Sequence, residues 1–251
     1  MEPAGAKWYT VGVNATPYAE APPDMAPFEN PLKVGLSAVR ANMVPMVVLW
    51  GVALAAIAGH LAHPPFAALL EPLARWQTEG GWLAAFLNRV VLCGIVPGLF
   101  LALVPSLRPP RLWLVVLVYS LWGGAWGIAC DVFFSLQAHV FGHGRDLATL
   151  AAKTAVDQLL WNVAICTPVN ALFFPWVAND FRRGGGTSLR AFLLGRCLPM
   201  LVSNWIVFVP VTVAVYAFPR PLQVQLTGLV GSFWMLVALS AGASRAKGDA
   251  E

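Results

Sequence analysis

The sequence predicts an all-α fold, a polytopic bundle of about six transmembrane helices with both termini on the cytoplasmic side. The first observation is composition: 58% of the 251 residues are hydrophobic and 11% are charged, whereas about a quarter are charged in soluble proteins. The second is that the apolar runs are continuous rather than alternating, which favours membrane helices over a porin-type barrel. The third is the scarcity of charge between positions 112 and 179, where the only Asp, Lys and Arg residues are Asp131, Arg145, Asp146, Lys153 and Asp157.

Six apolar windows reach the length of roughly 20 residues that a helix needs to cross a bilayer. They cover residues 42–62, 82–104, 112–136, 155–177, 198–217 and 222–243. Between the first two windows, large apolar residues recur at helical spacing, which predicts a helix lying on the membrane surface. These residues are Phe66, Leu69, Leu70, Leu73 and Trp76.

The windows divide the chain into four parts. Residues 1–40 are Pro-rich and are expected to form a disordered or extended tail. Residues 41–110 hold two spans with the interfacial helix between them. Residues 111–243 form a core of four spans, and residues 244–251 form a short C-terminal tail.

The Lys and Arg residues set the expected orientation, because cytoplasmic loops are enriched in positive charge. With six spans, eleven of the sixteen Lys and Arg residues fall on the side of the two termini, and five fall on the other. Those five are Arg75, Arg89, Arg145, Lys153 and Arg220. Both termini are therefore predicted to be cytoplasmic, or on the matrix side in an organelle. The net charge of +4 belongs to loops that touch anionic lipid heads, so no nucleic-acid partner is expected.

Polar residues inside the spans are candidates for function, because they are costly in a bilayer. Four spans place their most polar residues in the same outer third, where a shared solvated cavity is expected. These are Asn88 and Arg89, then Asp131, Ser135 and Gln137, then Lys153, Asp157 and Gln158, and finally Gln223 and Gln225. In the alternative interpretation Arg89 extends to the lipid headgroups, and Lys153 and Asp157 form an interfacial i, i+4 pair of little energetic value.

The fourth span continues this polar character inward. Gln158, Asn162, Cys166 and Asn170 lie four residues apart, which places them along one slowly rotating helix face. Asn170 is expected near the cytoplasmic end, where the next span begins with Ser203 and Asn204. Together these residues predict a polar track across the bundle. Pro168 and Pro210 would kink the two spans beside it. The alternative is that the polar side chains only fasten neighbouring helices together.

The third span carries a face of small residues. Gly123, Gly127, Asp131 and Ser135 repeat every four residues, and Gly123 with Gly127 forms a GxxxG motif. Such a face lets two helix backbones approach closely. It would also direct Asp131 into the bundle.

Signals for enzymatic chemistry are weak. His139 and His143 stand four residues apart, but glycines flank His143 and no third metal ligand is close in the sequence. The sequence contains no GxSxG, HExxH or P-loop motif. All four cysteines lie in apolar segments without a CxxC pair and are expected to be small buried hydrophobic residues. We therefore expect neither an enzyme nor a bound cofactor or metal.

The second half of the chain carries several recognisable motifs. They are Lys153-Thr-Ala-Val-Asp157-Gln158, Asn204-Trp-Ile-Val-Phe-Val-Pro210 and Phe233-Trp234 followed by Leu239-Ser240, with Gly127-Ile-Ala-Cys-Asp131 and Gln137 upstream. These motifs resemble those of the Mpv-seventeen family, that of the twenty-two-kilodalton peroxisomal membrane protein. The resemblance covers about residues 112–242. There are departures, since the family's W-P reads Leu198-Pro199 here, Trp205 replaces a Phe, and the family's Arg soon after Val-Pro is missing.

The resemblance implies a divergent family member that forms a pore-like membrane protein. Such proteins sit in mitochondrial inner, peroxisomal or vacuolar membranes; a bacterial member would sit in the cell inner membrane. Together with the polar track, this predicts a channel or passive transporter for small polar solutes or metabolites. Its partners would be the lipid bilayer and a small polar solute or ion, and homo-oligomerisation stays open. The alternative is a non-transporting membrane scaffold or homeostasis factor.

Overall fold

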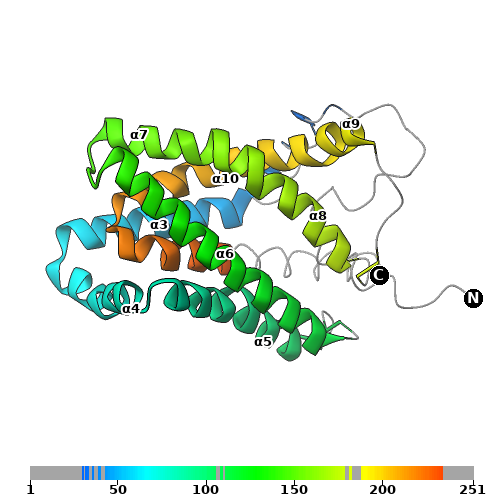
Figure 1. Cartoon of the computed structure of the whole chain (residues 1–251), viewed down its shortest axis with the longest axis horizontal. Helices are drawn as coiled ribbons and strands as arrows, with labels where there is room; N and C mark the ends of the chain where they lie inside the picture. Colours follow the sequence, from blue (N-terminus) through cyan, green and yellow to red (C-terminus); the bar gives the residue numbers. More distant parts are fainter. Residues whose placement is uncertain are drawn as a thin grey trace, which may run out of the picture.

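The computed structural model describes residues 43–105, 108–109, 111–178, 181–182 and 188–233, together with single positions between 30 and 40. Within these residues the secondary structure is helical, without strands (Figure 1). Outside the described residues lie positions 1–29 of the predicted N-terminal tail (1–40), the predicted C-terminal tail (244–251) and the predicted Trp234.

Eleven elements with defined bounds follow one another in the described part of the chain. They are α3 (Met43–Ala62), α4 (Pro64–Arg89), η1 (Val90–Ile95), α5 (Val96–Leu103), α6 (Leu112–Phe141), α7 (Leu147–Val156), η3 (Asp157–Cys166), α8 (Thr167–Ala178), α9 (Leu189–Phe192), η4 (Leu193–Cys197) and α10 (Leu198–Ala217). Residues 220–233 are also helical. The elements labelled η are π-helical stretches, which have a wider turn than an α-helix.

Four continuous helical segments are long and apolar enough to cross a membrane. They are Pro64–Leu103, Leu112–Phe141, Leu147–Val177 and Leu189–Ala217, and they contain the second to fifth predicted spans. The first predicted span corresponds to α3, whose apolar stretch Met46–Ala62 is shorter than these segments, and the last is described only as far as residue 233. The number of six spans therefore stays a prediction.

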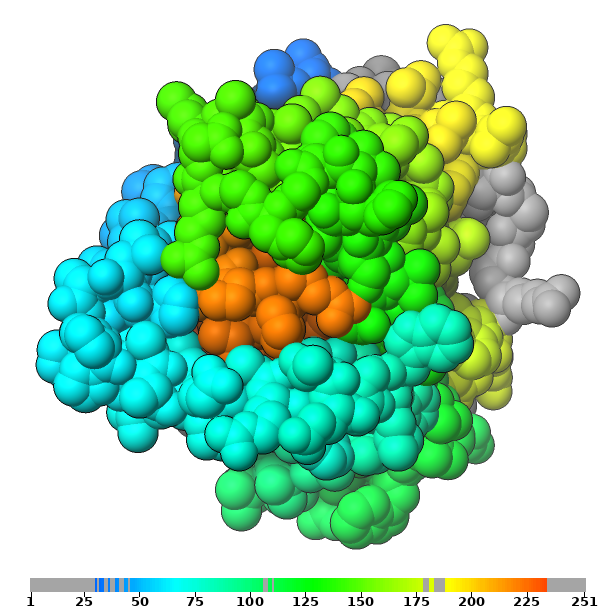
Figure 2. Space-filling model, turned by 60° about the vertical axis from the view of Figure 1, so that its left-hand side comes forward, coloured from blue at the N-terminus to red at the C-terminus, as the bar shows by residue number. Residues whose placement is uncertain are grey.

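A bend at Gly81 separates the predicted surface helix from the span that follows it. The first part of α4 begins at His63, whose Nδ1 accepts a hydrogen bond from the backbone N–H of Phe66 at 3.3 Å. At Gly81 the backbone takes φ +50° and ψ −127°, a conformation that glycine adopts readily and other residues avoid. In Figure 1 the first part of α4 (cyan) lies at the left end of the bundle, and the part after Gly81 runs along it. Figure 2 shows that end, where cyan and orange surfaces lie side by side.

Each π-helical stretch in the described residues ends two positions before a proline. Pro97 follows η1, Pro168 follows η3, and Pro199 follows η4. A proline has no backbone N–H to donate to the carbonyl of residue i−4, and its ring clashes with that carbonyl. A wider turn before the proline relieves both problems. By contrast, α10 remains α-helical through Pro210. Trp50 of α3 donates a hydrogen bond to the carbonyl of Val207, close to that proline, at 2.8 Å.

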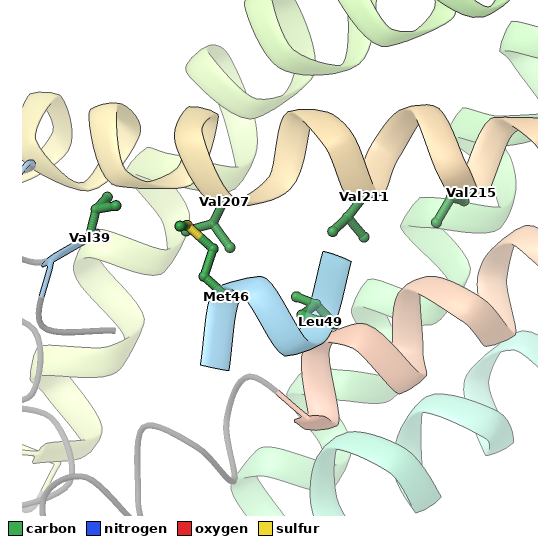
Figure 3. Packing of buried hydrophobic residues seen from close by; sticks show 6 residues of the cluster. All are labelled: Val39, Met46, Leu49, Val207, Val211 and Val215. Atoms are coloured by element: carbon green, nitrogen blue, oxygen red, sulfur yellow. The ribbon is translucent and has the colours of Figure 1, made fainter. Parts of the chain in front are cut away.

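One apolar cluster fastens α3 to α10. Its buried members are Val39, Met46, Leu49, Val207, Val211 and Val215. The three valines stand one helical turn apart on α10 and point toward Met46 and Leu49 (Figure 3). This packing holds α10 in place, so that its last residues and the helix that follows it reach the end of the bundle where polar side chains gather.

Candidate functional site

A cavity of about 730 Å³ opens at the end of the bundle where α4 bends. In Figure 2 the orange surface of residues near 220 lies in a hollow between α4 (cyan and turquoise) and the green surface of α6 and α7. The cavity lies beside helices that are long enough to span a membrane. It is lined by Gln77, Thr78, Gly81, Trp82, Asp131, Ser135, His143, Arg145, Lys153, Tyr216, Phe218, Pro219, Arg220, Pro221 and Gln223.

Asp131 is the acid in the wall of this cavity. The residue is 3% exposed, and its Oδ1 accepts hydrogen bonds from Gln77 at 2.9 Å and from Arg220 at 3.0 Å. Arg220 also donates to the backbone carbonyl of Asp131 at 3.2 Å and to the hydroxyl of Ser135. The amide of Gln77 accepts in turn from Gln225 at 3.0 Å. The carboxylate is therefore neutralised by a cation brought from a distant helix.

Lys153 is the buried cation of the cavity. It is 3% exposed, and its Nζ donates to the carbonyl oxygen of Gly142 at 2.7 Å. Gly142 ends α6 with φ +76°, a value that glycine tolerates and larger residues avoid. In the described part of the chain, Lys153 forms no ion pair.

The loop between α6 and α7 brings His143 and Arg145 to the cavity, and both side chains are exposed. The end of this loop is held by Asp146, the N-cap of α7. Its Oδ1 accepts from the backbone N–H of Thr149 at 3.0 Å, and its Oδ2 accepts from the Thr149 hydroxyl at 2.7 Å. These hydrogen bonds stabilise the carboxylate and lower the pKa of Asp146 below its ordinary value.

A second set of polar side chains forms a continuous hydrogen-bonded chain beneath the cavity. Gln137 donates to the hydroxyl of Tyr216 at 2.5 Å, and that hydroxyl donates to Oδ2 of Asp157 at 2.7 Å. Gln158 donates to Oδ1 of Asp157 at 2.9 Å and to Thr212 at 3.0 Å. The chain continues from Asn162 to Gln158 at 3.1 Å and from Thr167 to Asn162 at 2.9 Å. We call these residues (Gln137, Tyr216, Asp157, Gln158, Asn162 and Thr167) the polar chain.

The π-helical stretch η3 explains the spacing of the polar chain. Asn162 and Thr167 are five residues apart, and a π-helix brings positions i and i+5 together. Trp205 of α10 donates its indole N–H to the Gln158 carbonyl at 2.9 Å within this stretch. Because the wider turn rotates the helix face, the chain ends at Thr167. It includes neither Asn170 nor Asn204, which are half-buried, so these two predicted members of the track are not joined to it.

Seven of the ten predicted outer residues separate into two groups. Asp131, Lys153, Ser135 and Gln223 line the cavity, whereas Gln137, Asp157 and Gln158 belong to the polar chain. The alternative of a Lys153–Asp157 pair is wrong. Lys153 contacts Gly142 and Asp157 contacts Tyr216 and Gln158, because η3 begins at Asp157 and turns its carboxylate toward α10.

Arg89 does not extend to the lipid headgroups, so that alternative is also wrong. It is 8% exposed and donates to the hydroxyl of Thr227 at 2.8 Å, with sulfur atoms of Cys130 and Cys93 at 3.6 and 3.9 Å. Its Nε has no hydrogen-bond partner within the described residues. Gly127 and Gly228 leave room for it, since a Cβ at either would lie within 3.1 Å of an Arg89 side-chain carbon.

Gly123 and Gly127 mark the closest approach of α6 to the helix formed by α4 and η1. A Cβ on Gly123 would lie 2.8 Å from the Cβ of Cys93 and 2.9 Å from the carbonyl oxygen of Arg89. A Cβ on Gly127 would overlap the carbonyl oxygen of Ala85 and lie 2.8 Å from Cγ of Arg89. This approach places Asp131, one turn further along α6, beside Gln77.

Sequence reasoning missed Gln77, Tyr216, Thr212 and Thr167, and it treated Arg220 only as a loop charge. Gln77 belongs to the segment predicted to lie on the membrane surface, where a polar residue is ordinary. Tyr216 is the last aromatic residue before the end of α10, a position typical of membrane-interface anchors. A cation enclosed in the Pro219-Arg220-Pro221 turn was the one signal that could have indicated a partner for Asp131.

Among the described residues, no group of three His, Cys, Asp or Glu side chains is placed to hold a metal ion. The four cysteines are free thiols. Comparison with protein-family models, with curated proteins and with solved structures finds no match to this chain. The site is therefore interpreted from its own geometry.

Proposed function

We propose that this protein is an integral membrane channel or passive transporter for small polar solutes. The observation that carries the proposal is the cavity, which is lined by charged and amide side chains of three helical segments that could span a membrane and of the chain that follows the fourth. Burying such groups in a bilayer is costly, and a solvated path is one physical reason to keep them there. We propose in addition that the chain is a distant relative of the Mpv-seventeen family, as its motifs suggest.

The polar chain is the route by which the cavity would connect to the opposite end of the bundle. Tyr216 belongs to both, since it lines the cavity and its hydroxyl lies between Gln137 and Asp157. An aromatic cluster surrounds this point, with the rings of Phe133 and Trp161 stacked at 4.4 Å. We place the gate at Tyr216, because a solute that leaves the cavity in this direction has to displace its ring.

A second candidate function, a non-transporting membrane scaffold, is favoured by one specific observation. The polar atoms of Asp157, Gln158 and Asn162 bond mainly to one another and to neighbouring helices. Interhelical hydrogen bonds of this kind contribute about 0.6 to 2 kcal/mol each in membranes. These hydrogen bonds are sufficient for a scaffold, but a scaffold does not require the cavity.

Reconstitution into planar bilayers separates the two candidates. A transporter with an open pathway gives discrete conductance, and filling the cavity removes it. Thr78 suits this test, because it lines the cavity and, among the described residues, its hydroxyl bonds only to the nearby Ala74 carbonyl. Thr78→Trp should abolish most of the current. Leu69→Trp is the matched control, since Leu69 is 74% exposed on the same helix and lines no described cavity.

The outcomes assign the function. Conductance in the wild type and in Leu69→Trp, with loss in Thr78→Trp, supports transport through the cavity. Absence of conductance from folded, reconstituted wild-type protein would favour the scaffold. Equal currents from both variants would mean that any path avoids this cavity.

A further inference from the structure

The charges that line the cavity do not balance. Three basic side chains face it (Arg145, Lys153 and Arg220), whereas Asp131 is the only acid among the described residues that line it. Asp131 is already paired with Arg220 at 3.0 Å. Lys153 and Arg145 are left without a carboxylate partner in the part of the chain that the structure describes.

Lys153 is the buried part of this excess positive charge. An ammonium group has three N–H donors, and at Lys153 one of them meets the carbonyl of Gly142. Lys153 is 3% exposed and still borders the cavity. Buried cations are generally paired, because an uncompensated charge away from water is strongly unfavourable. The space in front of Lys153 is thus where a counter-charge would be most stabilised.

The surrounding groups also favour an anion. Arg145 and His143 stand exposed on the loop beside the cavity and add donors at its edge. The Gln223 amide already donates to the carbonyl of Phe218 at 3.1 Å. Since Oδ1 of Asp131 accepts from both Gln77 and Arg220, the Asp131 carboxylate is held by donors and is screened from an entering ligand.

We infer that the cavity takes a small oxyanion, a carboxylate or a phosphate, with Lys153 as its deep contact and Arg145 at its edge. This inference rests on the proposed function and names its substrate class. Positive potential in a recessed site concentrates anions and repels cations. A transported solute would then be a small acid rather than a sugar or a metal cation.

Binding is measured first, because it does not require transport. Thermal unfolding of the purified protein in detergent is followed in sodium succinate and in sodium phosphate, each compared with sodium chloride at equal ionic strength. The oxyanions should raise the unfolding temperature of the wild type with a saturating dose dependence. The anion that acts at the lower concentration identifies carboxylate or phosphate as the preferred chemistry.

Two variants test the assigned contacts. Lys153→Met should weaken the apparent affinity by about tenfold or more, because it removes a charge-assisted hydrogen bond. Arg145→Gln should weaken the apparent affinity by a smaller factor. Because Arg145 is exposed, this variant should fold even if Lys153→Met does not. Arg108→Met is the matched control, since it removes an exposed cation that does not line the cavity. Equal oxyanion effects in the wild type and Arg145→Gln, or no oxyanion effect in the wild type, would overturn the inference.

Dilution potentials across reconstituted bilayers separate this inference from the proposed function. A current that prefers anions, and loses that preference in Arg145→Gln, supports both. A current without anion preference overturns the substrate class and leaves transport standing. Oxyanion binding that depends on Lys153, in a protein that never conducts, would refute transport and keep the anion site.

Discussion

Replacing Gly127 with alanine should destabilise the bundle, although the same exchange stabilises most helices. At Gly127 the added Cβ would lie 2.8 Å from Cγ of Arg89 and closer still to the carbonyl oxygen of Ala85. Ordinary van der Waals contacts begin at 3.4 Å. The Arg89 side chain can rotate, but the Ala85 oxygen is backbone, so relief requires α6 and α4 to separate.

The magnitude follows from two opposing contributions. Alanine is favoured over glycine in a helix by about 0.5–1 kcal/mol. Overpacking a close contact costs about 1–3 kcal/mol, and a backbone atom on the other side places this site at the upper end of that range. We therefore expect Gly127→Ala to lower the free energy of unfolding by about 1–2 kcal/mol.

The assay is SDS-induced unfolding in mixed micelles, with Gly51→Ala as the matched control. Gly51 also lies in a helix, α3, but a Cβ there would meet nothing within 4 Å. Gly51→Ala should therefore be neutral or stabilising by up to about 1 kcal/mol. If Gly127→Ala unfolds at the same SDS fraction as Gly51→Ala, the close approach of α6 to α4 is not present in the folded protein.

Three further predictions concern the polar chain, the loop and the orientation. Gln158→Leu should lower the free energy of unfolding by about 1–3 kcal/mol, because buried partners lose their hydrogen bonds. The control Leu159→Ala, at an adjacent exposed position, should lower it by less. Equal effects of the two variants would contradict a structural role for the polar chain. Asp146 has a lowered pKa, so its capping contribution is complete above its ordinary value of 3.8 and is lost as the pH falls through the lowered value. Thr149→Ala removes one of its hydrogen bonds and should make the acid limb of the plot of unfolding temperature against pH shallower; an unchanged limb would refute this. Reporter fusions after the last residue and within residues 140–150 should lie on opposite sides of the membrane, and the same location for both would refute the orientation derived from the positive charges.

The long apolar helices, and the gathering of several of their polar residues at one end of the bundle, could be predicted from the sequence. Hydropathy and length are local properties, so the segments around 82–104, 112–136, 155–177 and 198–217 were identified without knowledge of their neighbours. Asp131 and Lys153 were expected at a common depth, and both line one cavity. Depth follows from position along a span, which a single helix already defines.

The partners of these residues were decided by the tertiary structure. Periodicity along one helix says which residues share a face, but it does not say which helix that face meets. Arg220 pairs with Asp131 from 89 positions away, and Tyr216 joins Asp157 across 59. The cause lies in packing: the approach at Gly127 and the bend at Gly81 bring Gln77 to Asp131.

The local geometry of the fourth span also could not be predicted from the sequence. An α-helical period places Asn170 in line with Gln158 and Asn162, yet the π-helical stretch before Pro168 rotates that face and substitutes Thr167 as the next member. Prolines mark where a helix must adjust, but whether it kinks or widens depends on what surrounds it. Pro168 follows a wide turn, whereas Pro210 sits in a helix that stays regular. The sequence by itself determined that the chain forms long apolar helices that carry polar residues, because these follow from short-range composition. The packing of the helices determines which charges pair and which remain unpaired beside the cavity. The reason is that pairing depends on contacts between residues far apart in the chain.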